Sequence, residues 1–450
     1  MRFSRSSDPS RPPILFVLPR LGLLAVVGGC LSLAGCTDAD SPDSGTTSAS
    51  GSAAPKPAAA KPDDAAAVKA LEEAGFALVK DSSGSVVEAS KASDEPIAGH
   101  LSNLEGLPSL RSLLLKGPGV GDDGLAVLEK LPNLQRLDLS ESAISDATMP
   151  IISRIAGLQV LALRRAGISN DSLSAISGLK KLRALDLRNS NIGDGGMDHV
   201  AAIGTLVDLQ LEKSKVTDSG VAKLASLPLK SLNLNAQTSL TNATLEILGK
   251  MPTLESIQLD STRISDDGMV HVANLTNLRR LRIRSTDITG VGLQHISELK
   301  ELERLELRDS SVDDDGIAVI VALPKVEFLD ISECRVVSKD GLKKLGGMTG
   351  LKHLGLWETR TDDGVMESLA GLKDLAELDL KATAITNASA AVIAGFSKLT
   401  VLSVSGTELD DDGIRQLKDL PLTSLDVSNT NAWDVIEELQ ASHPKLKITK

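Results

Sequence analysis

The chain has 450 residues and a formal net charge of -12. It is too long for one ordinary globular core, so it contains either several domains or a repeat. The acidic balance disfavours nucleic acid as a partner, because neutralising phosphates requires clustered Lys and Arg. Aromatic residues make up only 2%, with no Tyr, so aliphatic side chains must build the core. The three cysteines, Cys30, Cys36 and Cys334, define no disulfide framework.

Residues 1–35 have the pattern of an export signal peptide. Four arginines, at positions 2, 5, 11 and 20, precede an apolar stretch at 21–34, which is short for a membrane-spanning helix. The tetrapeptide at the end of this stretch, Leu33-Ala34-Gly35-Cys36, resembles the lipobox of bacterial lipoproteins. That resemblance implies lipidation of Cys36 as the first mature residue. It also implies a bacterial protein of the cell envelope, on the periplasmic or surface side, whose membrane contact is the lipid alone. The alternative is an ordinary cleaved signal with a chance Cys.

Residues 36–63 contain almost no large apolar side chain and are rich in Ser, Ala, Pro and Asp. Such a composition cannot bury enough surface to order itself, so we expect a disordered tether. A flexible chain of this length spans about 30 Å. Residues 64–100 then predict an N-terminal cap, with a helix at 64–76 followed by a hairpin that turns at Ser82-Ser83-Gly84.

From residue 101 to 431 one pattern recurs about 14 times with a period of 24 residues. Its first strand leucine, or a substitute, stands at positions 113, 137, 161, 185, 209, 232, 257, 281, 305, 329, 354, 378, 402 and 425. Each unit begins with Leu-x-Leu, which predicts a short strand with two side chains in the core. An Asp or Asn at the ninth position after the first leucine, such as Asp146, Asp194, Asp218 or Asp266, predicts a helix N-cap. A fixed period of this kind indicates a solenoid.

This pattern resembles the leucine-rich repeats. The resemblance implies an α/β, right-handed, horseshoe-shaped solenoid with parallel strands on its concave face and short helices on its convex face. The subtype resembles the F-box-type, cysteine-containing repeats, although no F-box precedes them. Five residues after the first leucine stands a column of Ser and Thr, once replaced by Cys334. We expect these side chains to bond turn backbone and Cys334 to be buried and unreactive. Residues 432–450 predict a C-terminal cap of one helix and a last strand.

The sequence contains no recognisable catalytic motif, so we expect no enzyme activity, no cofactor and no metal site. His199, His271 and His295 share one column of the repeat, but successive helices lie too far apart to hold one ion. The acidic runs at 313–316 and 410–413 lack the alternation of a calcium loop, and helix capping explains them. Asn170 and Asn242 match glycosylation acceptors, but both occupy the predicted cap column.

One part of the concave face stands out for its residue types. Residues beside the two core positions of a strand point to the same face. On four successive strands, the arginines and aromatic residues at these positions are Arg280, Arg282, Arg284, Arg304, Arg308, Phe328, His353 and Trp357. We expect Arg280 to face Arg304, and Glu306, Asp330 and Asp260 to neutralise part of this charge. A balanced, solvated charge lattice is one interpretation, and a binding site is the other, since Arg beside exposed aromatics is typical of interface hot spots.

The sequence therefore favours a monomeric scaffold that binds a protein partner, one that presents an acidic segment to this patch. A cell-wall or glycan binder is the alternative from another class, although sugar sites usually stack on aromatic rings and few are present. A structural spacer without a ligand is the third hypothesis.

Overall fold

The computed structural model describes residues 61–450. The predicted signal peptide, the lipidation site Cys36 and nearly all of the predicted tether lie outside the described residues. Within residues 61–450, no helix is both long and apolar enough to cross a membrane.

A single sheet of 17 strands runs through the described residues. β1 pairs antiparallel with β2, and from β2 onwards each strand pairs in parallel with the next. The strands are β1 Ala77–Lys80, β2 Val86–Ala92, β3 Ser112–Lys116, β4 Arg136–Asp138, β5 Val160–Ala162, β6 Ala184–Asp186, β7 Asp208–Gln210, β8 Ser231–Asn233, β9 Ser256–Gln258, β10 Arg280–Arg282, β11 Arg304–Glu306, β12 Phe328–Asp330, β13 His353–Gly355, β14 Glu377–Asp379, β15 Val401–Ser403, β16 Ser424–Asp426 and β17 Lys447–Thr449.

Short helices connect the strands. The α-helices are α1 Ala65–Glu73, α2 Ala98–Leu101, α3 Met149–Ile152, α4 Asp194–Ala201, α5 Asp218–Lys223, α6 Asn242–Leu248, α7 Asp266–Met269, α8 Gly290–Leu293, α9 Asp314–Val321, α10 Lys339–Lys343, α11 Asp363–Leu369, α12 Ala390–Ala394, α13 Asp411–Arg415 and α14 Asp434–Ser442. The 3-10 helices are η1 Ser102–Gly106, η2 Leu125–Lys130, η3 Asp146–Thr148, η4 Asp171–Gly178, η5 Val272–Asn274, η6 Gln294–Ile296, η7 Lys344–Gly347 and η8 Asn387–Ser389.

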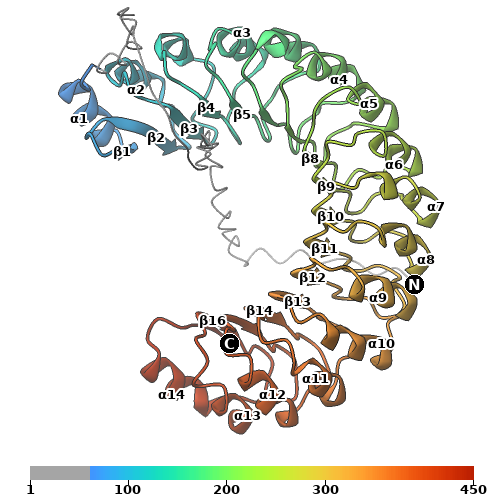
Figure 1. The fold of residues 1–450 in the computed structure, drawn as a ribbon. Coiled ribbons are helices and arrows are strands. Elements are labelled where there is room, and N and C mark those ends of the chain that lie inside the picture. Colours follow the sequence, from blue (N-terminus) through green and yellow to red (C-terminus); the bar gives the residue numbers. More distant parts are fainter. Residues whose placement is uncertain (1–60) are drawn as a thin grey trace, which may run out of the picture. The chain divides into compact units, whose positions relative to one another are not determined.

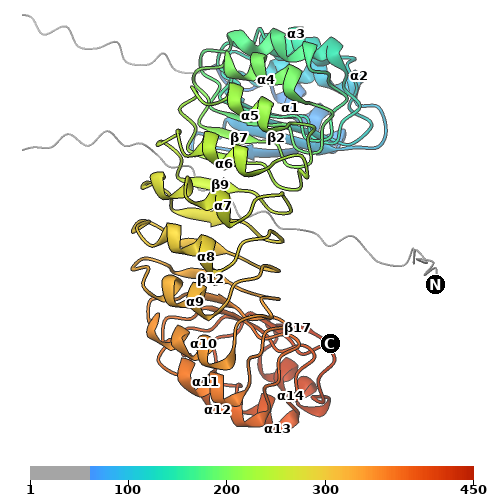
Figure 2. The same ribbon diagram turned by 90° about the vertical axis from the view of Figure 1, so that its right-hand side faces the viewer.

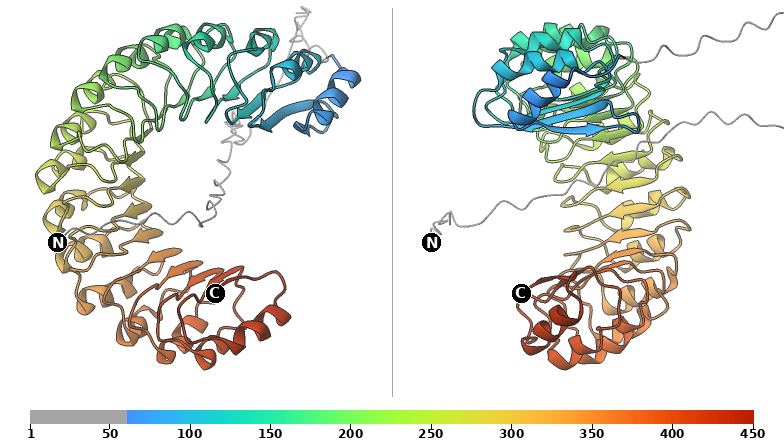
Figure 3. Two further views of the ribbon diagram at one scale, coloured as in Figure 1. Left: turned by 180° about the vertical axis from the view of Figure 1, so that it is seen from behind. Right: turned by 90° about the vertical axis from the view of Figure 1, so that its left-hand side faces the viewer.

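The described part of the chain is a curved solenoid, as the repeat predicts. Figure 1 shows the strands along the inner side of the curve and the helices along the outer side. Figure 2 looks onto the outer side of the middle turns, where α7 to α10 lie one after another, and Figure 3 shows the same arrangement from behind. Helices are wider than strands, so stacking the two on opposite sides bends the molecule. The predicted solenoid, with parallel strands on its concave face, is confirmed.

The strand register follows the predicted leucine column. Leu113 pairs with Leu137, and each later first leucine or isoleucine pairs with the next, as far as Leu402 and Leu425. The structure extends the column by one position at each end, with Ala89 opposite Leu113 and Ile448 opposite Leu425. β2, which the sequence assigns only to a hairpin, is therefore also the first strand of the parallel stack. It joins the N-terminal hairpin to the solenoid through backbone hydrogen bonds.

The hydroxyl column forms the backbone contacts that the sequence predicts. In nine turns a buried Ser or Thr hydroxyl donates to the carbonyl three residues earlier, as Thr286 does to Ile283 at 2.7 Å. We call this set the hydroxyl ladder. Cys334 takes the same place, fully buried, with its Sγ donating to the Leu307 carbonyl at 3.2 Å. Burial raises the pKa of the Cys334 thiol to about 11, so the prediction of a buried, unreactive thiol agrees with the structure.

The predicted role of Asp146, Asp194, Asp218 and Asp266 as N-caps is wrong. These residues are the first of their helices, and the N-cap is the residue before, such as Thr217. Their carboxylates reach the next turn instead. One oxygen accepts the backbone N–H of that turn's N-cap and the other accepts its hydroxyl, as Asp218 does with Thr241 at 3.0 and 2.8 Å. A stacked neighbour offers these donors because each helix start lies directly beside the next.

We call this set the aspartate ladder. Its two-pronged members are Asp122, Asp146, Asp194, Asp218, Asp266, Asp314 and Asp363. Asn170, Asn242 and Asn387 belong to the same column, and each accepts the next turn's N–H. Asn242 and Asn387 also donate Nδ2 to the side chain of that turn's N-cap. The column is interrupted twice, by Gly290 and by Lys339. The ladder therefore joins successive turns outside the sheet at most, but not all, steps.

Each turn also contains one residue in the left-handed backbone region. It is the fourth after the first strand leucine, with φ between 48° at Ala382 and 93° at Gly117. Only Gly117 and Gly406 are glycine, which alone adopts this region without strain. The N–H of the left-handed residue donates to the next turn, as Ala382 does to Ser405 at 2.8 Å. These inter-turn hydrogen bonds offset the strain that the side chains impose.

Both ends of the stack are covered. At the N-terminal end, α1 begins at its N-cap Asp64, and the turn between β1 and β2 has Gly84 at φ 86°. At the C-terminal end, α14 packs Val435, Ile436 and Leu439 into the core, and β17 adds the last strand.

Candidate functional site on the concave face

Three rows of side chains line the concave face. They come from the residue before the first core leucine of each strand, the residue between the two core positions, and the residue after the second. The predicted binding residues occupy these rows on β10 to β13, and we call them the Arg-aromatic patch: Arg280, Arg282, Arg284, Arg304, Arg308, Phe328, His353 and Trp357. The strand pairing places Arg280 opposite Arg304, Arg304 opposite Phe328 and Phe328 opposite His353, as the register predicts.

The first row contains a stack that crosses four strands. The Arg304 guanidinium lies 3.6 Å from the centre of the Phe328 ring, and the His353 ring stacks on Phe328 at 3.7 Å, nearly parallel at 4°. His353 Nδ1 lies 2.9 Å from Glu377 Oε2, and this hydrogen bond lowers the pKa of the Glu377 carboxyl. Arg304 on β11 and His353 on β13 lie on opposite sides of β12, so together they cover both faces of Phe328.

A second cation–π pair lies in the third row. The Arg308 guanidinium lies 4.1 Å from the centre of the Trp357 ring, while its Nε donates to Glu333 Oε1 at 2.7 Å. Ser332 occupies the intervening strand position, and its small side chain leaves room for Arg308 to reach across. Trp357 is half-buried, as expected for an amphipathic ring lying along the surface.

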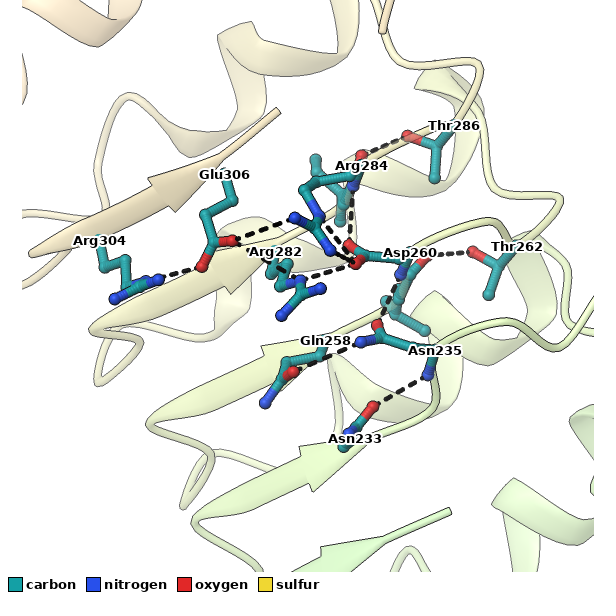
Figure 4. A network of polar contacts seen from close by, with 12 residues as sticks. Asn233, Asn235, Gln258, Asp260, Thr262, Arg282, Arg284, Thr286, Arg304 and Glu306 are labelled. Atoms are coloured by element: carbon teal, nitrogen blue, oxygen red, sulfur yellow. Dashed lines mark hydrogen bonds and ion pairs between the residues drawn. The ribbon is translucent and has the colours of Figure 1, made fainter. Parts of the chain in front are cut away.

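Two nearly buried carboxylates join the arginines of β10 and β11 (Figure 4). Asp260 accepts from Arg282 Nε at 2.6 Å and from Arg284 Nε at 2.8 Å. Glu306 accepts from Arg304 Nε at 2.6 Å and lies 3.6 Å from Arg282 Nε. Burial raises the pKa of Asp260, although the charge and hydrogen bonds of Arg284 act in the opposite direction. Asp260 and Glu306 therefore hold the guanidinium groups in place through their Nε edges.

The expected charge balance is right in two parts and wrong in one. Asp260 reaches Arg284, and Glu306 reaches Arg282, as predicted. Asp330 does not pair with Arg282. Its Oδ1 accepts the Ser332 N–H at 3.0 Å, in a turn closed within its own repeat. Among residues 61–450 the Arg280 guanidinium has no ion-pair partner, and the neighbouring Arg304 turns towards Phe328 and Glu306.

An amide network next to the patch was not predicted. Asn233 Nδ2 donates to Gln210 Oε1 at 3.0 Å. Asn235 Oδ1 accepts the Asp260 N–H at 2.8 Å (Figure 4). Asn235 Nδ2 also lies 3.4 Å from Gln258 Oε1. The network fixes the backbone of Asp260, and hence the carboxylate that holds two arginines. The signal was present in the sequence, because these residues share the concave columns of β7 to β9.

The structure also locates the residues considered for metals and calcium. Among residues 61–450, no three His, Cys, Asp or Glu side chains come together as an ion site would require, and this includes His199, His271 and His295. Asp313 and Asp410 cap α9 and α13 by accepting backbone N–H groups. The acidic runs thus act as helix caps, as expected.

One open hollow of about 630 Å³ lies near the N-terminal end, lined in part by Asp94, Lys116, Pro118 and Arg165. Its charges are partly satisfied within the fold, since Lys116 pairs with Asp138 at 2.9 Å and Arg165 lies 3.8 Å from Glu141. It contains none of the residues of the Arg-aromatic patch.

Comparison with known proteins identifies the repeat and the fold. A leucine-rich-repeat family model matches residues 178–201 and 274–297. No curated protein sequence matches the chain. Among solved structures, an internalin (inlF) of Listeria monocytogenes is similar, with 22% identity, a TM-score of 0.53, and coverage of 80% of this chain and 94% of that chain.

Two further structures have a similar fold. A leucine-rich-repeat protein of Leptospira interrogans shows 20% identity and a TM-score of 0.51, covering 77% of this chain and 92% of its own. A chain of the yeast Rad7 and Elc1 complex shows 18% identity and a TM-score of 0.51, covering 73% of this chain and 84% of its own. At these identities the likeness establishes a leucine-rich-repeat solenoid and nothing finer.

Proposed function

We propose that the chain is an exported, lipid-anchored scaffold that binds a protein partner through its concave face, with the Arg-aromatic patch as the contact site. Leucine-rich repeats commonly mediate protein–protein interaction, because stacked parallel strands present a long surface whose exposed positions vary freely. No arrangement of described residues resembles a catalytic site.

The observation that carries this proposal is the pair of cation–π contacts that the two β11 arginines make with rings of the β12 and β13 repeats. Arg304 on Phe328 and Arg308 on Trp357 are held rigidly, so a partner would bind without freezing long side chains. Arg and Trp in this setting are the residue types that dominate binding energy at interfaces. Arg280, which has no ion-pair partner among the described residues, supports a partner with an acidic segment.

The stacking argues against the glycan alternative at this site. A sugar ring packs on an open aromatic face. Both faces of Phe328 are covered, and one face of Trp357 is covered by Arg308. Protein binding through guanidinium groups and ring edges suits the same geometry better.

Export and anchoring rest on the sequence of residues 1–36. Two or more acyl chains give stable membrane attachment, which one chain does not. Cys36→Ser should abolish fatty-acid labelling and membrane fractionation. Retention of that variant in salt-washed membranes would contradict a lipid anchor at Cys36.

The binding site can be tested by capturing partners from cell-envelope proteins, with a glycan array in parallel. Arg308→Ala and Trp357→Ala should each weaken binding of a captured partner by about 1 kcal/mol or more. Arg136→Ala is the matched control, because Arg136 occupies the first row of β4 far from the patch. Equal binding by wild type and both patch variants would place the contact elsewhere on the surface.

A further inference from the structure

The concave face changes sign along the solenoid at the Arg-aromatic patch. β10 and β11, with the residue that follows each core pair, present five arginines. Asp260, Glu306 and Glu333 pair with four of them, so positive charge remains in excess and Arg280 has no ion-pair partner among the described residues. From β12 to β16 the same rows present Asp330, Glu377, Asp379 and Asp426 against one cation, Lys381. The remaining positions of that region are mostly Ser, Gly and Val. Among the described residues, no ion pair joins the arginines of the first group to the four carboxylates of the second.

The fold uses these four carboxylates to different extents. Asp426 accepts on both oxygens, from Ser403 and Ser428, and Glu377 is bonded by His353. Asp330 and Asp379 are only partly used. In Asp330 and Asp379 one oxygen accepts the N–H two residues later, at 3.0 and 3.1 Å. The second oxygen of Asp379 lies 3.6 Å from Lys381 Nζ. Gly355 separates Asp330 from Asp379 and has no side chain, so Asp330 Oδ1 would lie only 2.6 Å from a Cβ at that position. Asp330 therefore lies against the buried backbone of Gly355, on the side of β12 that faces Asp379.

Lys381 pairs with Asp379, and among the described residues no cation pairs with Asp330. Burial raises the pKa of Asp379, and the negative charge of Asp330 raises it further, although the Lys381 backbone and ammonium act against this. A positively charged group placed over Gly355 would contact both carboxylates and relieve their repulsion. The same strand carries His353 and Trp357 on either side of Gly355, so this position lies within the aromatic part of the patch.

We propose that the partner is a protein segment with acidic side chains at one end and basic side chains at the other, the acidic end on β10 and β11 and the basic end on β13 to β16. This rests on the proposed function and adds the charge order of the partner and its direction along the face. The centres of the two regions are about four strand steps apart, which at 4.8 Å per step is about 20 Å. An extended segment of about six residues covers that distance.

The test uses synthetic peptides and the fluorescence of Trp357. Trp433→Phe removes the only other tryptophan, so emission then reports on the boundary between the two regions. The probes are a peptide with glutamates at one end, a short Gly-Ser spacer and lysines at the other, and equally long peptides with glutamates only or lysines only. The full chain is titrated at low and at physiological salt. Binding that depends on exposed charges weakens at the higher salt concentration because of screening.

The bipolar peptide should bind at least ~5-fold more tightly than either single-sign peptide at low salt. Asp379→Lys with Asp426→Lys should reverse the order, so that the all-glutamate peptide binds best. Arg280→Glu with Arg304→Glu should instead favour the all-lysine peptide. Arg136→Glu and Glu212→Lys, on the same rows of β4 and the turn after β7, are matched controls and should leave the order unchanged.

Equal binding of the bipolar and all-glutamate peptides to wild type would overturn the proposed charge order. It would leave the proposed function standing if the captured partner still required Arg308 and Trp357. The chain's own segment 37–60, with Asp38, Asp40, Asp43 and Lys56, is another possible occupant. Deleting this segment tests that occupant. If the deletion shifts Trp357 emission in the absence of peptide, and the deleted chain binds the bipolar peptide no more tightly than the single-sign peptides, the proposal of an external partner would also be overturned.

Discussion

The hydroxyl ladder offers a direct test of how the turns are held together, and Thr286→Val is the sharpest change. The Thr286 hydroxyl donates to the Ile283 carbonyl at 2.7 Å, and Thr286 is only 7% exposed. Among the described residues this carbonyl has no other hydrogen-bond donor. Valine keeps the volume and the branched shape but cannot donate. The carbonyl is then left buried without a partner, which costs about 1–3 kcal/mol.

Thr407→Val is the matched control. The Thr407 hydroxyl also donates at 2.7 Å to a carbonyl three residues back, but the Thr407 backbone N–H donates to that same Val404 carbonyl at 3.3 Å. Its loss should therefore cost less, about 0.5–1.5 kcal/mol. Urea unfolding followed by far-ultraviolet circular dichroism measures both variants against wild type. If Thr286→Val were neutral or stabilising, or no worse than Thr407→Val, the column would be a size constraint and not a set of needed hydrogen bonds.

Three further changes test other parts of the fold. Burial raises the pKa of Asp218, but hydrogen bonds from Thr244 and Thr241 outweigh it and hold the pKa below its ordinary value, so the ionised form stabilises the fold. Asp218→Asn should lower the free energy of unfolding by about 1–2 kcal/mol at pH 7. This difference from wild type should shrink as the pH falls through about 4 and below, because the wild-type carboxylate is then protonated. Urea unfolding measures the difference, and a value that does not change with pH would contradict the prediction. Ala382→Gly should raise the free energy of unfolding by up to about 1 kcal/mol, because Ala382 has φ 48°, whereas Ala384→Gly, which lies outside the left-handed region, should lower it. In a chain with Cys30→Ser and Cys36→Ser, Cys334 should react with a thiol reagent at pH 8 only as fast as the protein unfolds, since its pKa is about 11, and immediate labelling of the folded protein would refute its burial.

The periodic features of the fold were predictable because they depend on local spacing. The leucine column sets the strand register, since each pairing from Leu113 to Leu425 follows from counting 24 residues with its four one-residue slips. The hydroxyl ladder followed for the same reason, because its acceptor lies three residues away in the same turn. The side-chain contacts between neighbouring turns could not be predicted in this way.

The aspartate ladder illustrates that limit. Asp218 before a helix looks like an N-cap when one repeat is considered alone, but the stacked Thr241 of the next turn offers a better pair of donors. The left-handed residues were hidden for a similar reason. Ala382 and Glu358 give no turn signal, and inter-turn hydrogen bonds impose the conformation on them.

The position of the Arg-aromatic patch could be predicted from the spacing of the repeat, but the contacts within the patch could not. The sequence placed Phe328, His353 and Trp357 on one face with the arginines. It gave no indication that Arg304 and His353 would cover Phe328 from both sides, or that Glu377 would bond His353. Side-chain rotamers decide those contacts, and several arrangements satisfy the same register.

The two interruptions of the aspartate ladder have a mechanical consequence. Gly290 follows β10 and Lys339 follows β12. At the joints between the β10 and β11 turns and between the β12 and β13 turns, the column therefore has no side-chain oxygen to accept the next turn's N–H. Lys339 reaches Asp362 by an ion pair, a looser link than paired hydrogen bonds. At the other steps an Asp or Asn of the column accepts the next turn's backbone N–H and resists shear between the turns. Elastic compliance should therefore concentrate at these two joints, directly behind the Arg-aromatic patch, where the horseshoe can open or close to match the curvature of what it holds while the flanking turns remain stiff.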